Sequence, residues 1–273
     1  MHSSEHPFTI EFGYGDVRIT THIHSHSFPP GFFAALHEGG HALYEQGIPR
    51  NLYRSLLDEG ASMAMHESQS RLWENHVGRS LSFWQHYYPQ LQSSFSPTLD
   101  DVSLDSFYKA INKVQPSNIR IEADEATYNL HVMLRFDIEV GLLDGSYFVK
   151  DLPAIWREKM VEYLGVQPPN DTQGVLQDIH WSDGLFGYFP TYTLGNVIAA
   201  QLWENIQKDI PDLHSYIRQG NFSPLLKWLR KKVHRYGAKL EPQVLLQQAV
   251  GETLNPKPYL NYLKDKFGQI YNL

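Results

Sequence analysis

The segment His37-Glu38-Gly39-Gly40-His41 constrains the fold more than any other part of the sequence. Its two histidines are four residues apart, and residues at this spacing lie on one face of an α-helix. A helix therefore lets both imidazoles reach one metal ion, and the H-E-x-x-H pattern puts Glu38 close to a water molecule at that metal. We expect a metal-binding helix here, with Glu38 as the general base. The alternative is a polar helix face that carries two histidines by chance.

A third metal ligand must come from elsewhere, because catalytic zinc takes three protein ligands and keeps one position open. Glu45 continues the same helix face but lies about 12 Å along the axis from His37, too far for metal bonds of about 2 Å. A glutamate on a following helix fits better, and Glu67 is the best placed. His66 is its rival, because only one of two adjacent helix residues faces the metal. Glu74 is a weaker choice.

Composition excludes several classes of protein and site. The sequence has no cysteine, which rules out disulfides and thiolate zinc ligands. A net charge of -7 argues against a nucleic-acid surface. No run of about 18 apolar residues is present. The polar N-terminal segment, residues 1–7, lacks the apolar stretch of a secretory signal. We therefore expect a cytoplasmic protein that binds neither nucleic acid nor a membrane.

Apolar periodicity and helix-terminating residues predict a mainly α fold. No internal repeat or Gly/Ser linker divides the sequence, so we expect a single catalytic domain over residues 1–273. Several predicted helices open with proline, which suits the first helical turn. The predicted helices are residues 32–46, 62–76, 98–115, 118–143, 152–164, 193–208, 224–236, 242–250 and 258–271.

Residues 9–28 are the exception to the helical pattern. Apolar and polar side chains alternate over residues 17–24, which is typical of a strand, and residues 13–16 can turn a hairpin. We expect a small β-hairpin beside the metal helix. His22, His24 and His26 would share one face of that strand. We favour a solvated strand or loop over a second metal site at these histidines.

The sequence resembles the thermostable (Taq-type) metallocarboxypeptidases. The resemblance covers essentially the whole chain, which is similar to the C-terminal half of a family member about twice as long. We therefore expect the family's N-terminal helical half to be absent. Six motifs carry the resemblance in chain order: His6-Pro7-Phe8, Asp16-Val17-Arg18-Ile19-Thr20, His37 to His41, His66-Glu67-Ser68-Gln69, Ile119 to Asp124, and Gly174 to Trp181.

The resemblance implies a helical groove-type zincin (gluzincin) that releases C-terminal amino acids from peptides. It implies a Zn²⁺ cofactor, with Co²⁺ as an alternative, held by His37, His41 and Glu67, and it assigns Glu38 as the base. It further implies a peptide substrate and self-association, for example as a homodimer. Two other functions stay open: a catalytically weak half-length homologue that binds a peptide or partner, and an oligo-endopeptidase of the related groove class.

The resemblance also nominates residues that stabilise the oxyanion. Related groove peptidases use tyrosine and histidine side chains for this purpose. The candidates here are His180, Tyr188 and Tyr192, which lie on or beside a glycine-rich loop.

A carboxypeptidase must also recognise a terminal carboxylate, and a guanidinium group binds a carboxylate through two hydrogen bonds. We choose Arg120, which lies within the Ile119 to Asp124 motif, with Arg18 and Arg135 as rivals. A structural ion pair is an equally weighted role for Arg120. For Arg18 we favour a structural role with Asp16.

Overall fold

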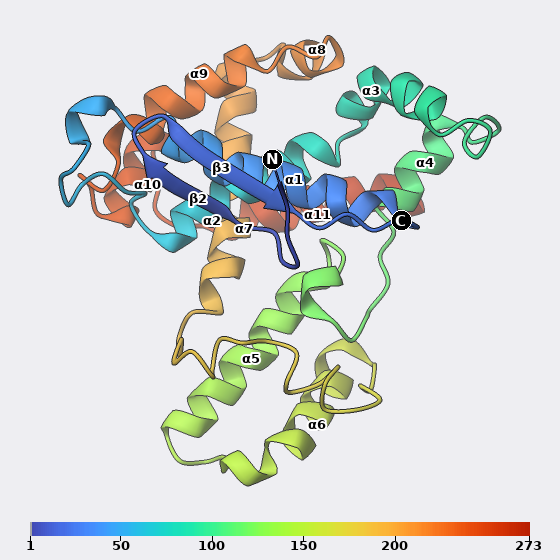
Figure 1. Ribbon diagram of the computed structural model, residues 1–273, viewed down its shortest axis with the longest axis vertical. Helices are drawn as coiled ribbons and strands as arrows, with labels where there is room; N and C mark the ends of the chain where they lie inside the picture. The colour runs from blue at the N-terminus through green and yellow to red at the C-terminus, as the bar shows by residue number, and fades with distance from the viewer. Residues whose placement is uncertain (1) are drawn as a thin grey trace. The chain divides into compact units, whose positions relative to one another are not determined.

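A computed structural model describes residues 2–273, which form two compact units. Met1, the first residue of the polar N-terminal segment, lies outside the described residues. Unit 1 comprises the chain up to Ile111 together with Leu194–Leu273, and unit 2 comprises Asn112–Thr193. The predicted mainly α fold is confirmed (Figure 1). The single domain stays a prediction.

The helices account for most of both units. In residues 2–273 no helix is both long enough and apolar enough to span a membrane. Unit 1 contains α1 (Phe28–Glu45), α2 (Met63–Arg71), α3 (Leu81–Ser94), α4 (Leu104–Ile111), α8 (Leu213–Arg218), α9 (Ser223–Lys232), α10 (Pro242–Val250), α11 (Lys257–Tyr271) and most of α7 (Pro190–Asp209). Unit 2 contains α5 (Tyr128–Leu143) and α6 (Leu152–Leu164).

The predicted hairpin is present in unit 1. It consists of antiparallel strands β2 (Thr9–Gly13) and β3 (Asp16–Thr21), with glycines of positive φ at the end of β2 (Gly13) and in the turn (Gly15). The sequence does not predict the short strand β1 (His2–Ser3), which pairs in parallel with β3 and gives the strand order β1-β3-β2.

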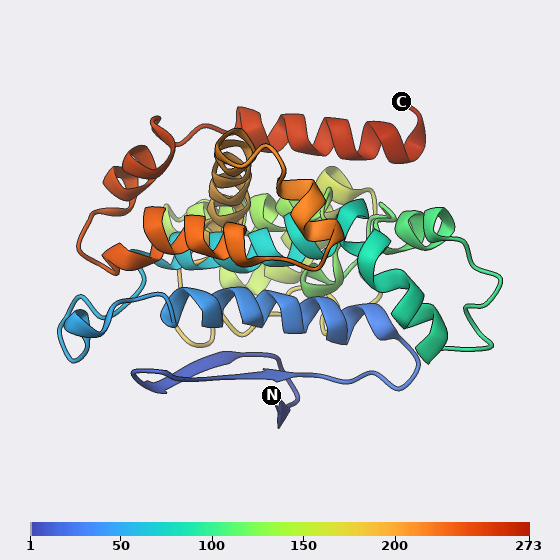
Figure 2. The same cartoon turned by 90° about the horizontal axis from the view of Figure 1, so that it is seen from above.

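The hairpin lies along α1, as Figures 1 and 2 show. The hydroxyl of Thr9 donates to the backbone carbonyl of Glu38 at 2.9 Å, and that of Thr21 donates to the carbonyl of Gly31 at 3.0 Å. A Cβ atom on Gly31 would lie 2.8 Å from the carbonyl oxygen of residue 22, so this glycine permits the close approach. The expected position of the hairpin beside the metal helix is confirmed.

The strand ends earlier than predicted. Strand β3 stops at Thr21, so the expectation that His22, His24 and His26 share a strand face is wrong. After the strand, an isolated antiparallel β-bridge joins His24 and Ser27, just before α1 begins.

Helix α1 begins at Phe28, earlier than the predicted start at Phe32. Pro29 and Pro30 occupy its first turn, where backbone N–H groups have no helical partner and a missing donor carries no penalty. The predicted range 32–46, which leaves both prolines outside the helix, is therefore wrong at its start.

The helix predicted for residues 62–76 forms as two joined segments. The hydroxyl of Ser62 accepts a hydrogen bond from the N–H of Met65 at 3.1 Å and caps α2. A π-helical segment, η2 (Leu72–Gly78), continues from the end of α2. Such wide turns are frequent at functional sites, and η2 carries Glu74.

The sequence misses α3 and α8, and it predicts α4 as part of a longer helix over residues 98–115. Pro89 lies inside α3, and an internal proline removes a backbone donor and normally ends a helix. Ser80 nevertheless caps this helix by accepting from the N–H of Phe83 at 3.2 Å.

Two other helices start at positions that differ from the prediction. The helix predicted for residues 118–143 begins only at Tyr128, because the Asp124 carboxylate accepts the N–H groups of Ala126 and Thr127 at 2.9 Å and forms a turn there. Helix α7 starts at Pro190 instead of residue 193. The bounds predicted for α6 and α10 are confirmed.

Each unit has its own apolar core. The core of unit 1 draws residues from α1, α2, α3, α7, α9 and α10, with Trp84 and Leu202 almost fully buried. In unit 2, Ile138 of α5 and Trp156 of α6 belong to one apolar cluster.

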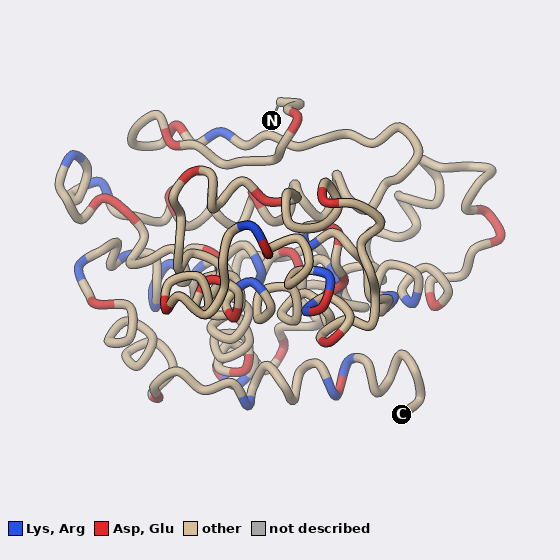
Figure 3. The backbone as a smooth tube through the Cα atoms, turned by 90° about the horizontal axis from the view of Figure 1, so that it is seen from below, with Lys and Arg blue, Asp and Glu red and all other residues tan. Residues whose placement is uncertain are grey.

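Figure 3 shows basic and acidic residues interspersed along the chain. The absence of nucleic-acid binding stays a prediction.

Helix α1 approaches α2 closely at Gly40. A Cβ atom on Gly40 would lie 2.6 Å from both the carbonyl oxygen of Gln69 and the Cα atom of Ser70. Both atoms belong to backbone, which cannot yield as a side chain does. The neighbouring Gly39, by contrast, has nothing within 4 Å of such an atom.

These two glycines form a matched pair for mutation. We expect Gly40→Ala to destabilise the protein by about 1–3 kcal/mol through overpacking. Gly39→Ala should be stabilising by up to about 1 kcal/mol, because alanine has the higher helix propensity. Urea unfolding of both variants measures the difference. Equal stabilities would contradict the close contact.

Candidate metal centre

Helices α1 and α2 bring His37, His41 and Glu67 together in unit 1. One ligand atom from each side chain lies within 4.8 Å of the others. The Oε2 atom of Glu67 is 3.6 Å from His37 Nε2 and 3.5 Å from His41 Nε2. Atoms bound tetrahedrally to zinc at about 2.0–2.1 Å lie about 3.3 Å apart, so the two distances from Glu67 are close to the spacing of zinc ligands.

The Glu67 carboxylate is held so that one oxygen faces the histidines, and this oxygen also lies 3.2 Å from the Ser70 hydroxyl. Its Oε1 atom accepts from Arg71 Nε at 2.7 Å, and its Oε2 atom points to the two histidines. Burial acts to raise the pKa of Glu67, but Arg71, His37 and His41 lower it well below the usual range. The side chain is therefore an ionised carboxylate, as a metal ligand must be.

His37 presents its Nε2 atom because its other nitrogen is engaged. The Nδ1–H group donates to Glu74 Oε2 at 2.9 Å, and the same carboxylate oxygen accepts from Arg71 at 3.2 Å. Burial tends to raise the pKa of Glu74, whereas Arg71, His37 and Arg79 lower it to about 2. A ligating histidine typically donates its second N–H to a carboxylate in this way.

His41 and the rival ligand His66 contact each other. The Nδ1 atoms of the two rings are within hydrogen-bond distance, and His66 Nε2 contacts Glu45. His66 and Glu45 therefore lie behind His41, on the side away from the Nε2 atom that faces Glu67. Burial lowers the pKa of His41, which favours the neutral imidazole that binds metals.

Glu38 lies next to the cluster on α1 and is largely buried. The hydroxyl of Thr9, on strand β2, lies 2.6 Å from Glu38 Oε2 and 2.9 Å from the backbone carbonyl of the same residue, so its one hydrogen is shared between two acceptors. This double contact fixes the side chain and leaves Oε1 for another partner.

In unit 2, Arg120 and Arg135 share the carboxylate of Asp178. Arg120 donates to Asp178 Oδ1 at 2.8 Å and to the Tyr128 hydroxyl at 2.8 Å. Arg135 donates to Asp178 Oδ2 at 2.7 Å. Both arginines are buried, and the Gln177 side chain accepts from each of them. This arrangement supports the structural role of Arg120, with Asp178 as its ion-pair partner. The role of Arg120 in carboxylate binding stays a prediction.

The three predicted oxyanion residues also cluster in unit 2. His180 Nε2 lies 2.9 Å from the Tyr192 hydroxyl, and the His180 and Tyr188 rings are 5.5 Å apart. Arg120 lies over the Tyr192 ring at 4.7 Å. The four residues predicted for the oxyanion and the terminal carboxylate thus form one cluster.

Other candidate residues lie outside both clusters. Arg18 pairs with Asp16 at 2.8 Å on the exposed hairpin, as favoured from the sequence. Among residues 2–273, His37, His41 and Glu67 are the only set of three with metal-ligand spacing.

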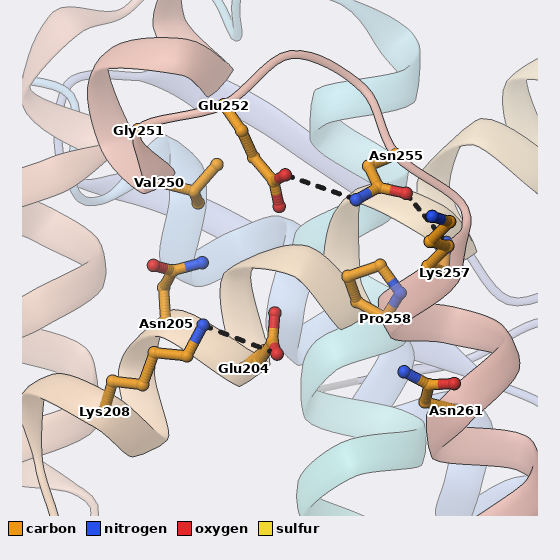
Figure 4. Close-up of a pocket in the computed structure, with 10 residues that line it drawn as sticks. All are labelled: Glu204, Asn205, Lys208, Val250, Gly251, Glu252, Asn255, Lys257, Pro258 and Asn261. Carbon is orange, nitrogen blue, oxygen red and sulfur yellow. Dashed lines mark hydrogen bonds and ion pairs between the residues drawn. The ribbon is translucent and has the colours of Figure 1, made fainter.

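Unit 1 also has a polar pocket between α7, α10 and α11 (Figure 4). Within the pocket Lys208 pairs with Glu204 at 3.4 Å, and the Asn255 side chain donates to Glu252 at 3.2 Å. It offers no imidazole ligand among its lining residues.

Comparison with known proteins now identifies the family. The model of the carboxypeptidase Taq (M32) metallopeptidases matches residues 1–267. The chain belongs to this family. It is 47% identical to thermostable carboxypeptidase 1 of Thermus thermophilus over 266 residues, and 43% identical to carboxypeptidase 1 of Bacillus subtilis over 268 residues. The crystal structure of the M32 carboxypeptidase from Deinococcus radiodurans superposes with a TM-score of 0.97 at 41% identity.

The M32 relatives are longer than this chain. The Thermus match covers 97% of the chain but 52% of the relative, and the Bacillus match covers 98% and 54%. The Deinococcus structure covers 100% of the chain, which matches 55% of it. The chain therefore spans about half the length of the curated relatives it matches.

The sequence prediction missed several residues that hold these clusters. Arg71 orients Glu67, and its i+4 spacing on the same helix was the available signal. A Cβ atom on Gly195 would lie 2.4 Å from Glu67 Cγ, so α7 also confines this ligand. Buried Glu139 accepts from Trp181 Nε1 at 2.8 Å and from the N–H of Gly187 at 3.0 Å, which fixes the loop carrying Tyr188. No sequence pattern indicated these long-range contacts.

We expect Asp178→Asn to destabilise the protein by about 3–5 kcal/mol at pH 7, because it leaves two buried arginines without a counterion. Burial alone raises the pKa of Asp178, but Arg135 and Arg120 lower it below the usual value of an aspartate. The stabilisation is therefore complete above about pH 4 and lost as pH falls through the folded-state pKa.

Urea unfolding at several pH values tests this expectation. The stability gap between the parent and Asp178→Asn should narrow below pH 4, because the parent then also loses the charge. Exposed Asp183 provides the control, and Asp183→Asn should unfold like the parent. A variant Asp178→Asn as stable as the parent at pH 7 would contradict the ion-pair account.

Proposed function

We propose that the chain carries the catalytic centre of a metallocarboxypeptidase that removes C-terminal amino acids from peptides. One observation carries the proposal: His37, His41 and Glu67 converge with metal-ligand spacing, while Glu38 is fixed beside them. Membership of the M32 family supports it, and two relatives are named carboxypeptidases.

Zn²⁺ is the metal that we assign to this site. Two imidazoles and one carboxylate with an open fourth position are a common catalytic zinc set. Co²⁺ accepts the same donors and is the alternative. Bound zinc would supply a Lewis acid and lower the pKa of water at the open position.

Glu38 performs the proton transfers in this proposal. Thr9 holds its Oε2 atom, so Oε1 is free to take a proton from the attacking water. The protonated carboxyl then delivers that proton to the leaving amine. Fixing the carboxylate from the hairpin removes rotamer freedom before the reaction.

His180, Tyr188 and Tyr192 are the proposed donors to the oxyanion. The contact between His180 and Tyr192 orients both side chains, and hydroxyl or N–H groups placed before the reaction stabilise developing negative charge best. Arg120 remains our candidate for the substrate's terminal carboxylate.

The substrate and the state of the protein follow from the same proposal. We infer a peptide substrate and self-association as a homodimer, and we retain the cytoplasmic location expected from composition. The chain spans about half the length of its relatives, so the proposed activity is to be measured on this chain itself.

The first test is Glu38→Gln. We expect release of C-terminal amino acids to fall by at least about 10²-fold, the scale of a general base, with zinc content unchanged. Amino-acid release and metal analysis on one sample measure both. Full activity in Glu38→Gln would contradict the assigned base.

A second test distinguishes the candidate functions. The parent should hydrolyse peptides with a free C-terminus and spare the same peptides with an amidated C-terminus. Cleavage of amidated peptides would indicate an oligo-endopeptidase. Zinc binding without any turnover would indicate a half-length homologue that only binds peptides or partners.

A further inference from the structure

We propose that His66 and Glu45 are positioning residues that hold the metal ligand His41 in its binding tautomer. The inference rests on the proposed metal centre and deepens it. His66 Nδ1 is 2.5 Å from His41 Nδ1, and His66 Nε2 is 2.5 Å from Glu45 Oε1. The three side chains thus form a continuous chain of hydrogen bonds that leads to the metal position.

The hydrogen positions follow from the chemistry of the end group. An ionised carboxylate can only accept, so the hydrogen shared with Glu45 belongs to His66 Nε2. A neutral imidazole carries one N–H, which makes His66 Nδ1 an acceptor. His41 must then donate from Nδ1, and its Nε2 atom keeps the lone pair that faces Glu67 at 3.5 Å.

The two ligand histidines reach the same tautomer by different routes. His37 donates directly to the carboxylate of Glu74, whereas His41 reaches a carboxylate only through His66. The tautomer of His41 therefore also depends on the orientation of the His66 ring. The Tyr44 ring lies 5.1 Å from that of His66, and its hydroxyl is anchored by the N–H of residue 61 at 3.1 Å.

The hydrogen bonds that join His41, His66 and Glu45 are shielded from water. The side chains of His66 and Glu45 are 16% and 14% exposed, so little water competes for their hydrogen bonds. Glu11 of strand β2 also contacts Glu45, and burial followed by the Glu45 charge raises the pKa of Glu11. The hairpin that holds Glu38 therefore also lies beside Glu45.

Zinc affinity of the metal-free protein, measured by competition with a chelator, tests the proposal. His66→Phe keeps a flat ring but removes the acceptor, and we expect it to weaken zinc binding about 10–100-fold. His66→Asn retains an acceptor near the Nδ1 position and should weaken it less.

Glu45 gives an independent pair of variants at the end of α1. Glu45→Ala removes the acceptor for His66 and should weaken zinc binding about 10-fold or more. Glu45→Gln keeps an acceptor oxygen and should retain most of the affinity. Glu158→Gln, at an exposed position in unit 2, is the control and should bind zinc like the parent.

Two further variants separate failure of this proposal from failure of the metal centre itself. His41→Ala and Glu67→Gln should lose zinc at concentrations that saturate the parent. If both retain it, the proposed centre is wrong. If both lose it while His66→Phe and Glu45→Ala bind like the parent, the centre stands and the positioning role is overturned. Circular dichroism of each metal-free variant checks folding, and the Glu45 pair decides if His66→Phe does not fold.

Discussion

The contact of α1 with α2 at Gly40 is the constraint on which the metal centre depends. Ligands from two helices can converge only if the helix backbones come close, and a Cβ atom at Gly40 would meet the backbone of α2 at 2.6 Å. Gly195 provides the same freedom for α7 beside Glu67. The small residues in this region therefore permit the approach, and the large polar residues around them set the orientation of each ligand.

Buried charges balance around the ligands. Arg71 contacts both Glu67 and Glu74, so the two carboxylates next to the histidines have a cation in place without a metal. Buried carboxylates left unpaired would instead take up protons. The hairpin also acts on the site, because Thr9 on strand β2 contacts the Glu38 carboxylate at 2.6 Å. The sheet thus contributes to the chemistry of a mainly helical protein.

The sequence predicted the spacing-dependent features and missed the long-range ones. Helical periodicity was sufficient for α6 and α10, and the i+4 rule was sufficient for the histidine pair. Prolines led to wrong predictions for two helices. Pro29 and Pro30 lie in the first turn of α1, and Pro89 lies inside α3. Residue spacing could not predict the hydrogen bonds of His66 to His41 and Glu45, because they join residues far apart in the chain. For the same reason the Asp178 ion pairs that occupy Arg120 could not be read from the sequence.

The central claim is that His37, His41 and Glu67 bind one catalytic metal ion. X-ray absorption spectroscopy of the zinc-loaded protein tests it most directly, because the metal's own neighbours are observed. The account predicts a first shell of nitrogen and oxygen at about 2.0–2.1 Å, with outer-shell scattering from two imidazoles. It also predicts that His41→Ala takes up no zinc under the loading conditions that saturate the parent. A spectrum without imidazole scattering, or one that His41→Ala leaves unchanged, would contradict the account.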